Sequence, residues 1–264
     1  MPRVPCSGRI HYDCRHRFVL KCGTLATSVM VHARIAAMNT SSTSTARDTM
    51  RRHRQVREYS VGEEIGNAVT HGVGAALAIA AIPISIVHAV GDGGGVLLAA
   101  ALIYSISMLL EYLASTLYHA LAVDGAKRVF KVLDHAAIYL FIAGSYTPFC
   151  LVTLAASGGM YLCAFVWALA VVGMAVEAFW VFRPRWVSVV IYLVMGWCVV
   201  WFLPALIANL EPAGLWLLVA GGLCYSVGCV FYVLKKIPFM HMVFHLWVLA
   251  GSILQFFSIL LFVL

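Results

Sequence analysis

From residue 66 to its end, the chain is a succession of seven long apolar runs, separated by turn-forming or basic segments. The hydrocarbon core of a bilayer is about 30 Å thick, and about 20 helical residues span it. The runs do not show the short alternating pattern of a membrane β-barrel. The predicted spans are 66–90, 95–121, 135–156, 160–182, 187–208, 213–234 and 240–264. The sequence therefore predicts an all-α membrane protein, folded as a bundle of seven transmembrane helices.

The composition favours the same fold class. Of the 264 residues, 62% are hydrophobic and 11% are charged, whereas a soluble domain is about 45–50% apolar and about 25% charged. These values exclude a soluble globular, a disordered and a fibrous protein. The eight cysteines contain no C-x-x-C pair, so we interpret those in the apolar runs as buried free thiols.

The basic residues are unevenly distributed along the chain. Residues 1–60 contain 11 of the 18 Lys and Arg residues, whereas residues 61–264 contain 7 basic and 8 acidic residues. We interpret 1–60 as a basic, disordered N-terminal tail and 61–264 as the membrane domain. The alternative is an over-extended start, with the true beginning at Met38 or Met50. A tail of this kind is not a nucleic-acid-binding face, so the expected partners are membrane lipids and no nucleic acid.

The same residues predict the topology. If the N-terminus is cytosolic, then the tail and the loops after the second, fourth and sixth spans all face the cytosol. Together these segments contain all 18 basic residues, and the other loops contain none. Cytosolic segments carry an excess of Lys and Arg. The expected protein is therefore a multi-pass protein of the cell membrane, such as a bacterial inner membrane, with a cytosolic N-terminus and an external C-terminus.

Polar residues gather at one depth of the predicted bundle, near its cytosolic face. Within a span, residues four apart share one helix face, and ionisable groups in membrane helices are costly unless they serve a site. This set comprises Ser115 and His119 in the second span, Asp134 at the start of the third, and His241 and His245 at the start of the seventh.

Two imidazoles at i and i+4 provide half of a zinc site. His119 completes a set of three histidines with His241 and His245, which leaves a fourth tetrahedral position for water. Asp134 could hydrogen-bond this water or act as a general base, and Ser115 could bind a substrate carbonyl, stabilise an oxyanion or orient a ligand. The alternative is that these histidines are interfacial helix-end residues with satisfied hydrogen bonds.

Segments around these residues resemble the hemolysin III family, which belongs with the progestin and adiponectin receptors. The resemblance spans residues 63–252 in order and does not cover 1–57. The matching segments are 63–71 (EEIGNAVTH), 115–119 (STLYH), 133–139 (LDHAAIY), 143–148 (AGSYTP) and 241–252 (HMVFHLWVLAGS).

The resemblance implies a Zn²⁺ held just inside the cytosolic face by three histidines, which correspond to His119, His241 and His245. It also implies that Asp134 associates with the zinc-bound water and that Ser115 is the serine of the Ser-x-x-x-His segment. One departure is visible: family members often read Gly-Ser-x-x-His near the end of the last helix, and here the final residue is Gln255. We expect this change to leave the zinc site intact. It argues against a second polar site of the family type deeper in the bundle.

Three functions compete. Related receptors are credited with ceramidase-like amide hydrolysis, so the first hypothesis is a zinc-dependent hydrolase of a lipid amide or ester. The second is a pore-forming, cytolytic protein, although the outer halves of the spans lack the continuous polar face that a pore needs. The third is a receptor in which the zinc is structural. The sequence predicts neither the substrate nor the oligomeric state.

Overall fold

The structure, a computed structural model, describes residues 59–91, 94–180, 184–234 and 236–264. Except for Tyr59 and Ser60, the predicted tail 1–60 lies outside these ranges. The helices are α2 (Val61–Gly91), α3 (Gly95–Ala120), α4 (Asp124–Pro148), α5 (Gly159–Trp180), α6 (Arg185–Trp197), α7 (Leu203–Asn209), α8 (Pro212–Val233) and α9 (Met240–Phe262). Short non-α turns are η1 (Phe149–Thr153), η2 (Ala155–Ser157) and η3 (Cys198–Phe202).

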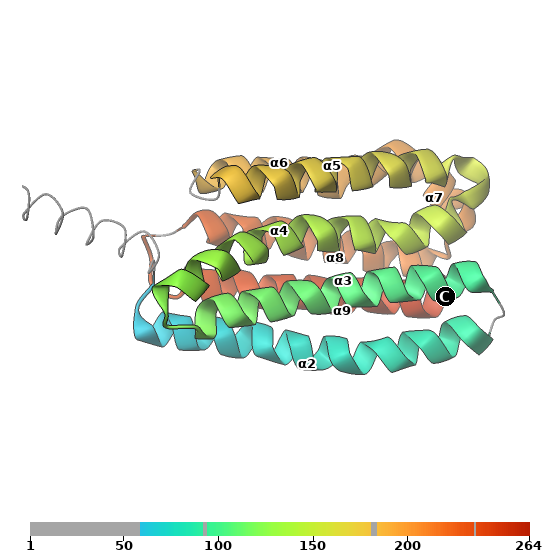
Figure 1. Cartoon of the computed structure of the whole chain (residues 1–264). Coiled ribbons are helices and arrows are strands. Elements are labelled where there is room, and N and C mark those ends of the chain that lie inside the picture. Colours follow the sequence, from blue (N-terminus) through green and yellow to red (C-terminus); the bar gives the residue numbers. More distant parts are fainter. Residues whose placement is uncertain (1–58, 92–93, 181–183, 235) are drawn as a thin grey trace, which may run out of the picture. The chain divides into compact units, whose positions relative to one another are not determined.

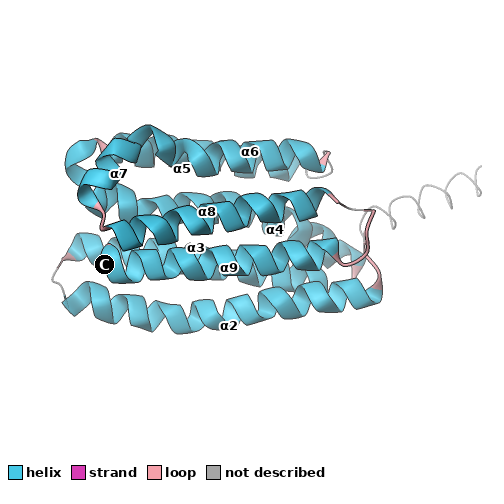
Figure 2. Cartoon of the chain, turned by 180° about the vertical axis from the view of Figure 1, so that it is seen from behind, coloured by secondary structure: helices cyan, strands magenta, loops and turns pink. Residues whose placement is uncertain are grey.

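Within the described ranges, seven helical stretches are long and apolar enough to cross a membrane, and no strand is present. They are α2, α3, α4 continued by η1, α5, the broken stretch from α6 to α7, α8 and α9. The helices lie side by side in one bundle, with α2 at one edge and α5 and α6 at the other (Figure 1; Figure 2 shows the reverse face). The predicted all-α, seven-span fold class is confirmed.

The first span starts earlier than predicted, at Val61 rather than at residue 66. Ser60 and Glu63 form a capping box: the Ser60 backbone N–H donates to Glu63 Oε2 at 3.0 Å, and Glu63 N–H donates to Ser60 Oγ at 3.4 Å. Glu63 Oε1 also accepts the backbone N–H of Phe239, at 3.0 Å, immediately before α9. One carboxylate therefore ties the start of α2 to the start of α9.

The third span also starts earlier than the predicted residue 135. The basic segment 124–131, which the predicted spans leave in the loop after the second span, is helical. Helix α4 begins at Asp124, and the side chains of Lys127 and Lys131 are buried. Lys127 Nζ pairs with Glu64 Oε1 at 2.8 Å and donates to the Tyr118 carbonyl oxygen at 2.9 Å. Because a partner on α2 neutralises this ammonium group, the basic segment is helical and packed.

The fifth span is interrupted by the 3-10 turn η3 between α6 and α7. Tyr146 of α4 stabilises this break, because its hydroxyl donates to the Gly196 carbonyl oxygen at 2.6 Å and accepts the Val199 N–H at 3.0 Å. Irregular backbone at membrane depth requires such partners within the protein. A cavity of about 370 Å³, lined by residues of α3, α4, α6, α8 and α9, lies beside the break.

Candidate metal centre

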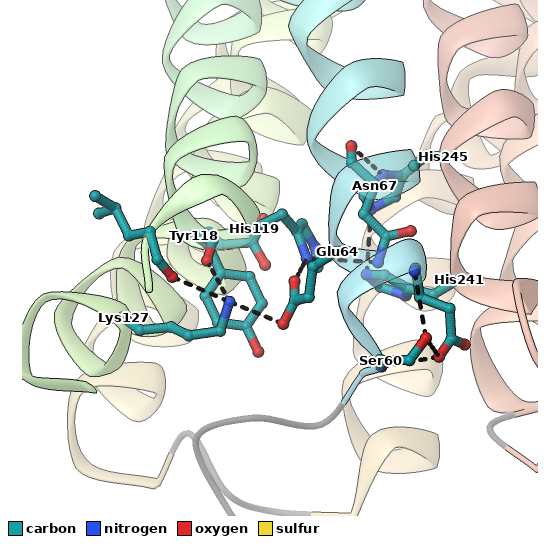
Figure 3. A network of polar contacts seen from close by, with 12 residues as sticks. Ser60, Glu64, Asn67, Tyr118, His119, Lys127, His241 and His245 are labelled. Carbon is teal, nitrogen blue, oxygen red and sulfur yellow. Dashed lines mark hydrogen bonds and ion pairs between the residues drawn. The ribbon is translucent and has the colours of Figure 1, made fainter. Parts of the chain in front are cut away.

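Three histidines that are far apart in the sequence meet at one end of the bundle (Figure 3). His119 lies in the last turn of α3, whereas His241 and His245 share one face of the first turns of α9. One ring nitrogen from each lies within 4.8 Å of the others, and all three side chains are buried. The predicted convergence is therefore present, and this group could hold a metal ion.

The spacing of the ring nitrogens suits a tetrahedral ion. Zn–N bonds of about 2.0–2.1 Å place neighbouring ligand atoms about 3.3–3.4 Å apart. His241 Nε2 and His245 Nε2 are 3.1 Å apart, close to this spacing. The ligand atom of His119 lies within 4.8 Å of both.

The hydrogen bonds of His245 orient it for metal binding. Its Nδ1 lies 3.3 Å from the backbone carbonyl oxygen of Asn67. A carbonyl only accepts, so Nδ1 carries the proton and Nε2 presents a lone pair towards His241. A lone pair directed at another imidazole nitrogen 3.1 Å away is stabilised by a cation or a proton between the two.

His119 has the partner that metal-bound histidines commonly have. Its Nδ1 donates to Glu64 Oε2 at 2.6 Å, and Glu64 Oε1 pairs with Lys127 (Figure 3). The opposite nitrogen, His119 Nε2, is buried and has no hydrogen-bond partner among the described residues. A carboxylate behind a metal-binding histidine fixes its tautomer and raises its basicity. This orphaned nitrogen is the observation that best fits a metal ion at the site.

Glu64 was not identified from the sequence as an orienting residue. Its helical spacing was the available signal, because Glu64, Asn67 and His71 recur at i, i+3 and i+7 and so share one face of α2. The structure directs that face at the histidines. Asn67 Nδ2 lies 3.4 Å from His119 Nδ1, and the His71 ring stacks on His245 with a centroid separation of 3.5 Å.

The two predicted catalytic residues are both buried, on neighbouring helices. Ser115 lies one turn before His119 on α3, and its Oγ has no hydrogen-bond partner among the described residues. Asp134 lies on α4, with Oδ2 at 3.9 Å from Nε2 of His135. Asp134 does not belong to the group of candidate metal ligands. The catalytic roles of Ser115 and Asp134 stay predictions.

Gln255 belongs to a polar cluster deeper in the bundle. Its Oε1 accepts the Tyr225 hydroxyl at 3.2 Å, and Tyr225 lies 3.1 Å from Ser252 Oγ. The Tyr112 hydroxyl donates to the same Ser252 Oγ at 2.7 Å. The departure at Gln255 from the family pattern is therefore compatible with a second polar cluster at this depth.

Comparison with known proteins agrees with this architecture. A family model described as "Haemolysin-III related" matches residues 59–256. "Hemolysin-3" of Bacillus cereus is 45% identical over 204 residues, which cover 77% of this chain and 93% of that protein. A "Hemolysin-3 homolog" of Bacillus subtilis (strain 168) is 43% identical over 202 residues, covering 76% of this chain and 95% of the relative.

A more distant relative is the "Monocyte to macrophage differentiation factor" of Homo sapiens, which is 28% identical over 165 residues. That match covers 60% of this chain and 67% of the human protein. The family match covers the seven spans from the start of α2 into α9 and includes all three histidines. This chain belongs to the haemolysin III-related family of multi-pass membrane proteins.

Proposed function

We propose that this protein is a zinc-dependent hydrolase of a lipid amide or ester. The observation that carries the proposal is the buried group of three histidines, in which Glu64 and the Asn67 carbonyl engage the Nδ1 atoms of His119 and His245. Zn²⁺ held by three imidazoles supplies Lewis acidity and makes water acidic enough to act as a nucleophile near neutral pH.

The side chains around the histidines provide the remaining functions of such a site. Glu64 and Asn67 hold two imidazoles in the tautomer that directs Nε2 inward. Ser115 Oγ, buried and without a hydrogen-bond partner in the part of the chain that the structure describes, can donate to a substrate carbonyl as negative charge develops on its oxygen. Asp134 is proposed as the general base that accepts a proton from the attacking water.

The apolar cavity favours a lipid substrate. Its volume of about 370 Å³ lies within the range of small-molecule sites, which is about 300–1,000 Å³. Aliphatic and aromatic side chains dominate the lining, among them Ile138, Phe141, Leu218 and Val248. A hydrocarbon chain is the ligand that such a surface matches, and the surrounding bilayer would supply it.

The proposed orientation places the site at the cytosolic face of the cell membrane. This orientation is supported by the distribution of the 18 basic residues, which all lie in the tail and in the loops after the second, fourth and sixth spans. Lys127, one of these residues, is joined to the histidine group through Glu64. In this orientation the N-terminus is cytosolic and the C-terminus external.

The test begins with metal content and continues with turnover. The purified protein should contain one equivalent of zinc by inductively coupled plasma mass spectrometry. It should hydrolyse a long-chain N-acyl amide or ester, lose this activity after chelation, and regain it when zinc is restored. Protein with bound zinc but no hydrolysis would contradict the enzyme proposal and favour a structural metal. Protein without zinc would contradict the metal centre itself.

Cytolysis needs a separate measurement, because two relatives carry the name hemolysin. Dye-loaded phosphatidylcholine vesicles containing the purified protein should retain the dye, since the hydrolase proposal requires no pore. Dye release that scales with protein and persists after chelation would instead support the pore-forming alternative.

A further inference from the structure

One acidic group lines the apolar cavity. Glu111 lies on α3, eight residues or about 12 Å along the helix from His119. Its side chain is 4% exposed, and its Oε2 has no hydrogen-bond partner among the described residues. The proposed hydrolysis assigns this residue no role. Because an intramembrane carboxylate is costly unless it serves a site, Glu111 requires a functional explanation.

The neighbouring polar groups do not satisfy Glu111. The Tyr112 hydroxyl donates to Ser252 Oγ, and the Tyr225 hydroxyl donates to Gln255 Oε1. Each hydroxyl has one proton, so neither is available to Oε2 of Glu111. His71 Nδ1 lies 3.9 Å from Glu111 Oε1, too far for a direct hydrogen bond.

We propose that the cavity binds a single-chain amphiphile whose head group donates a hydrogen bond to Glu111, with a primary alkyl amine as the best-matched class. The apolar lining accommodates the chain, and the carboxylate accepts from the ammonium group. Opposite charges also compensate for each other's burial. A fatty acid is a poorer match, because its carboxylate would meet a second carboxylate in a site of low polarity.

The binding site does not depend on the metal centre. Glu111 is not a member of the histidine group, and the cavity lining does not include the three histidines. The proposed function assigns the same cavity to the hydrocarbon chain of its substrate, so the inference extends that proposal. Amine binding is measured without turnover, so its outcome is separate from that of the hydrolysis test.

The test measures equilibrium binding of tritiated dodecylamine to the full chain in phosphatidylcholine nanodiscs, with empty nanodiscs as background. Wild-type protein should show one saturable site. Glu111→Gln should weaken the binding at least about tenfold, the factor expected for loss of one charge-assisted hydrogen bond. Dodecanoate, which has the same chain length, should bind wild-type protein at least about tenfold more weakly than the amine.

Glu177→Gln is the matched control. Glu177 is also a fully buried membrane carboxylate, but it lies on α5, outside the cavity lining, with Oε1 at 3.4 Å from the Tyr192 hydroxyl. This variant should bind dodecylamine within about twofold of wild type. Val219→Trp, which introduces an indole into the cavity wall, should abolish saturable amine binding.

Three results would overturn the inference. The first is unchanged amine binding by a Glu111→Gln protein that elutes as a single species with wild-type helicity. The second is binding of dodecanoate as tight as that of dodecylamine, a comparison that needs only wild-type protein and remains decisive if the variant fails to fold. The third is the absence of any saturable site for dodecylamine on the wild-type protein, which would mean that the cavity does not bind this amphiphile.

Discussion

The substitution Glu64→Gln should weaken zinc binding without removing a ligand. One orientation of the new amide donates to His119 Nδ1 and reverses the tautomer that the Glu64 carboxylate now enforces. The other orientation accepts from His119 but directs an NH₂ group at Lys127. The side chain of Lys127 is only 3% exposed, so its charge would then be buried without an opposite charge beside it.

The expected size of the effect follows from the role of Glu64 behind the ligand. Loss of such a partner typically costs about 10–100-fold in metal affinity, which equals about 1.4–2.7 kcal/mol. The double variant Glu64→Gln/Lys127→Met should recover part of this loss. Without the ammonium group, the amide can turn its oxygen to His119 at no electrostatic cost.

The assay is a competition titration. Purified protein is stripped of metal and then titrated with Zn²⁺ against a chromophoric chelator of known affinity. The matched control is Glu63→Gln, which removes the neighbouring charge at the same helix start. Glu63 bonds to Ser60 and Phe239 rather than to a histidine, so this variant should retain zinc affinity within about threefold. Equal affinities for wild-type, Glu63→Gln and Glu64→Gln proteins would refute the orienting role of Glu64.

Three further outcomes are expected. His119→Ala, His241→Ala and His245→Ala should each lose zinc, because a three-histidine site binds poorly with one ligand missing; one full equivalent in any of these purified proteins would disprove that ligand. Asp134→Asn should retain zinc but hydrolyse lipid about 10²–10⁴-fold more slowly, since an amide cannot accept the proton; wild-type turnover would remove Asp134 from the mechanism. A reporter fused after Leu264 should be active only outside the cytosol, and cytosolic activity would reverse the topology.

The sequence alone was sufficient for the fold class, because hydropathy is a local property. A run of about 20 apolar residues predicts a membrane span wherever its neighbours lie. The described residues contain seven helical stretches long and apolar enough to be such spans. The i, i+4 spacing of His241 and His245 likewise predicts a shared helix face. His119 could be added to them because the predicted topology placed it at the same depth.

Tertiary structure decided which charges are paired and therefore where helices begin. From the sequence alone, the segment 124–131 is interpreted as a basic loop. In the structure Lys127 pairs with Glu64, more than 60 residues earlier in the chain, and α4 starts at Asp124. The orienting role of Glu64 and the line from His245 through His71 to Glu111 depend on how α2, α3 and α9 pack. Hydropathy and helical periodicity describe one helix at a time, whereas hydrogen bonds and cavities form between helices, and only their packing determines these.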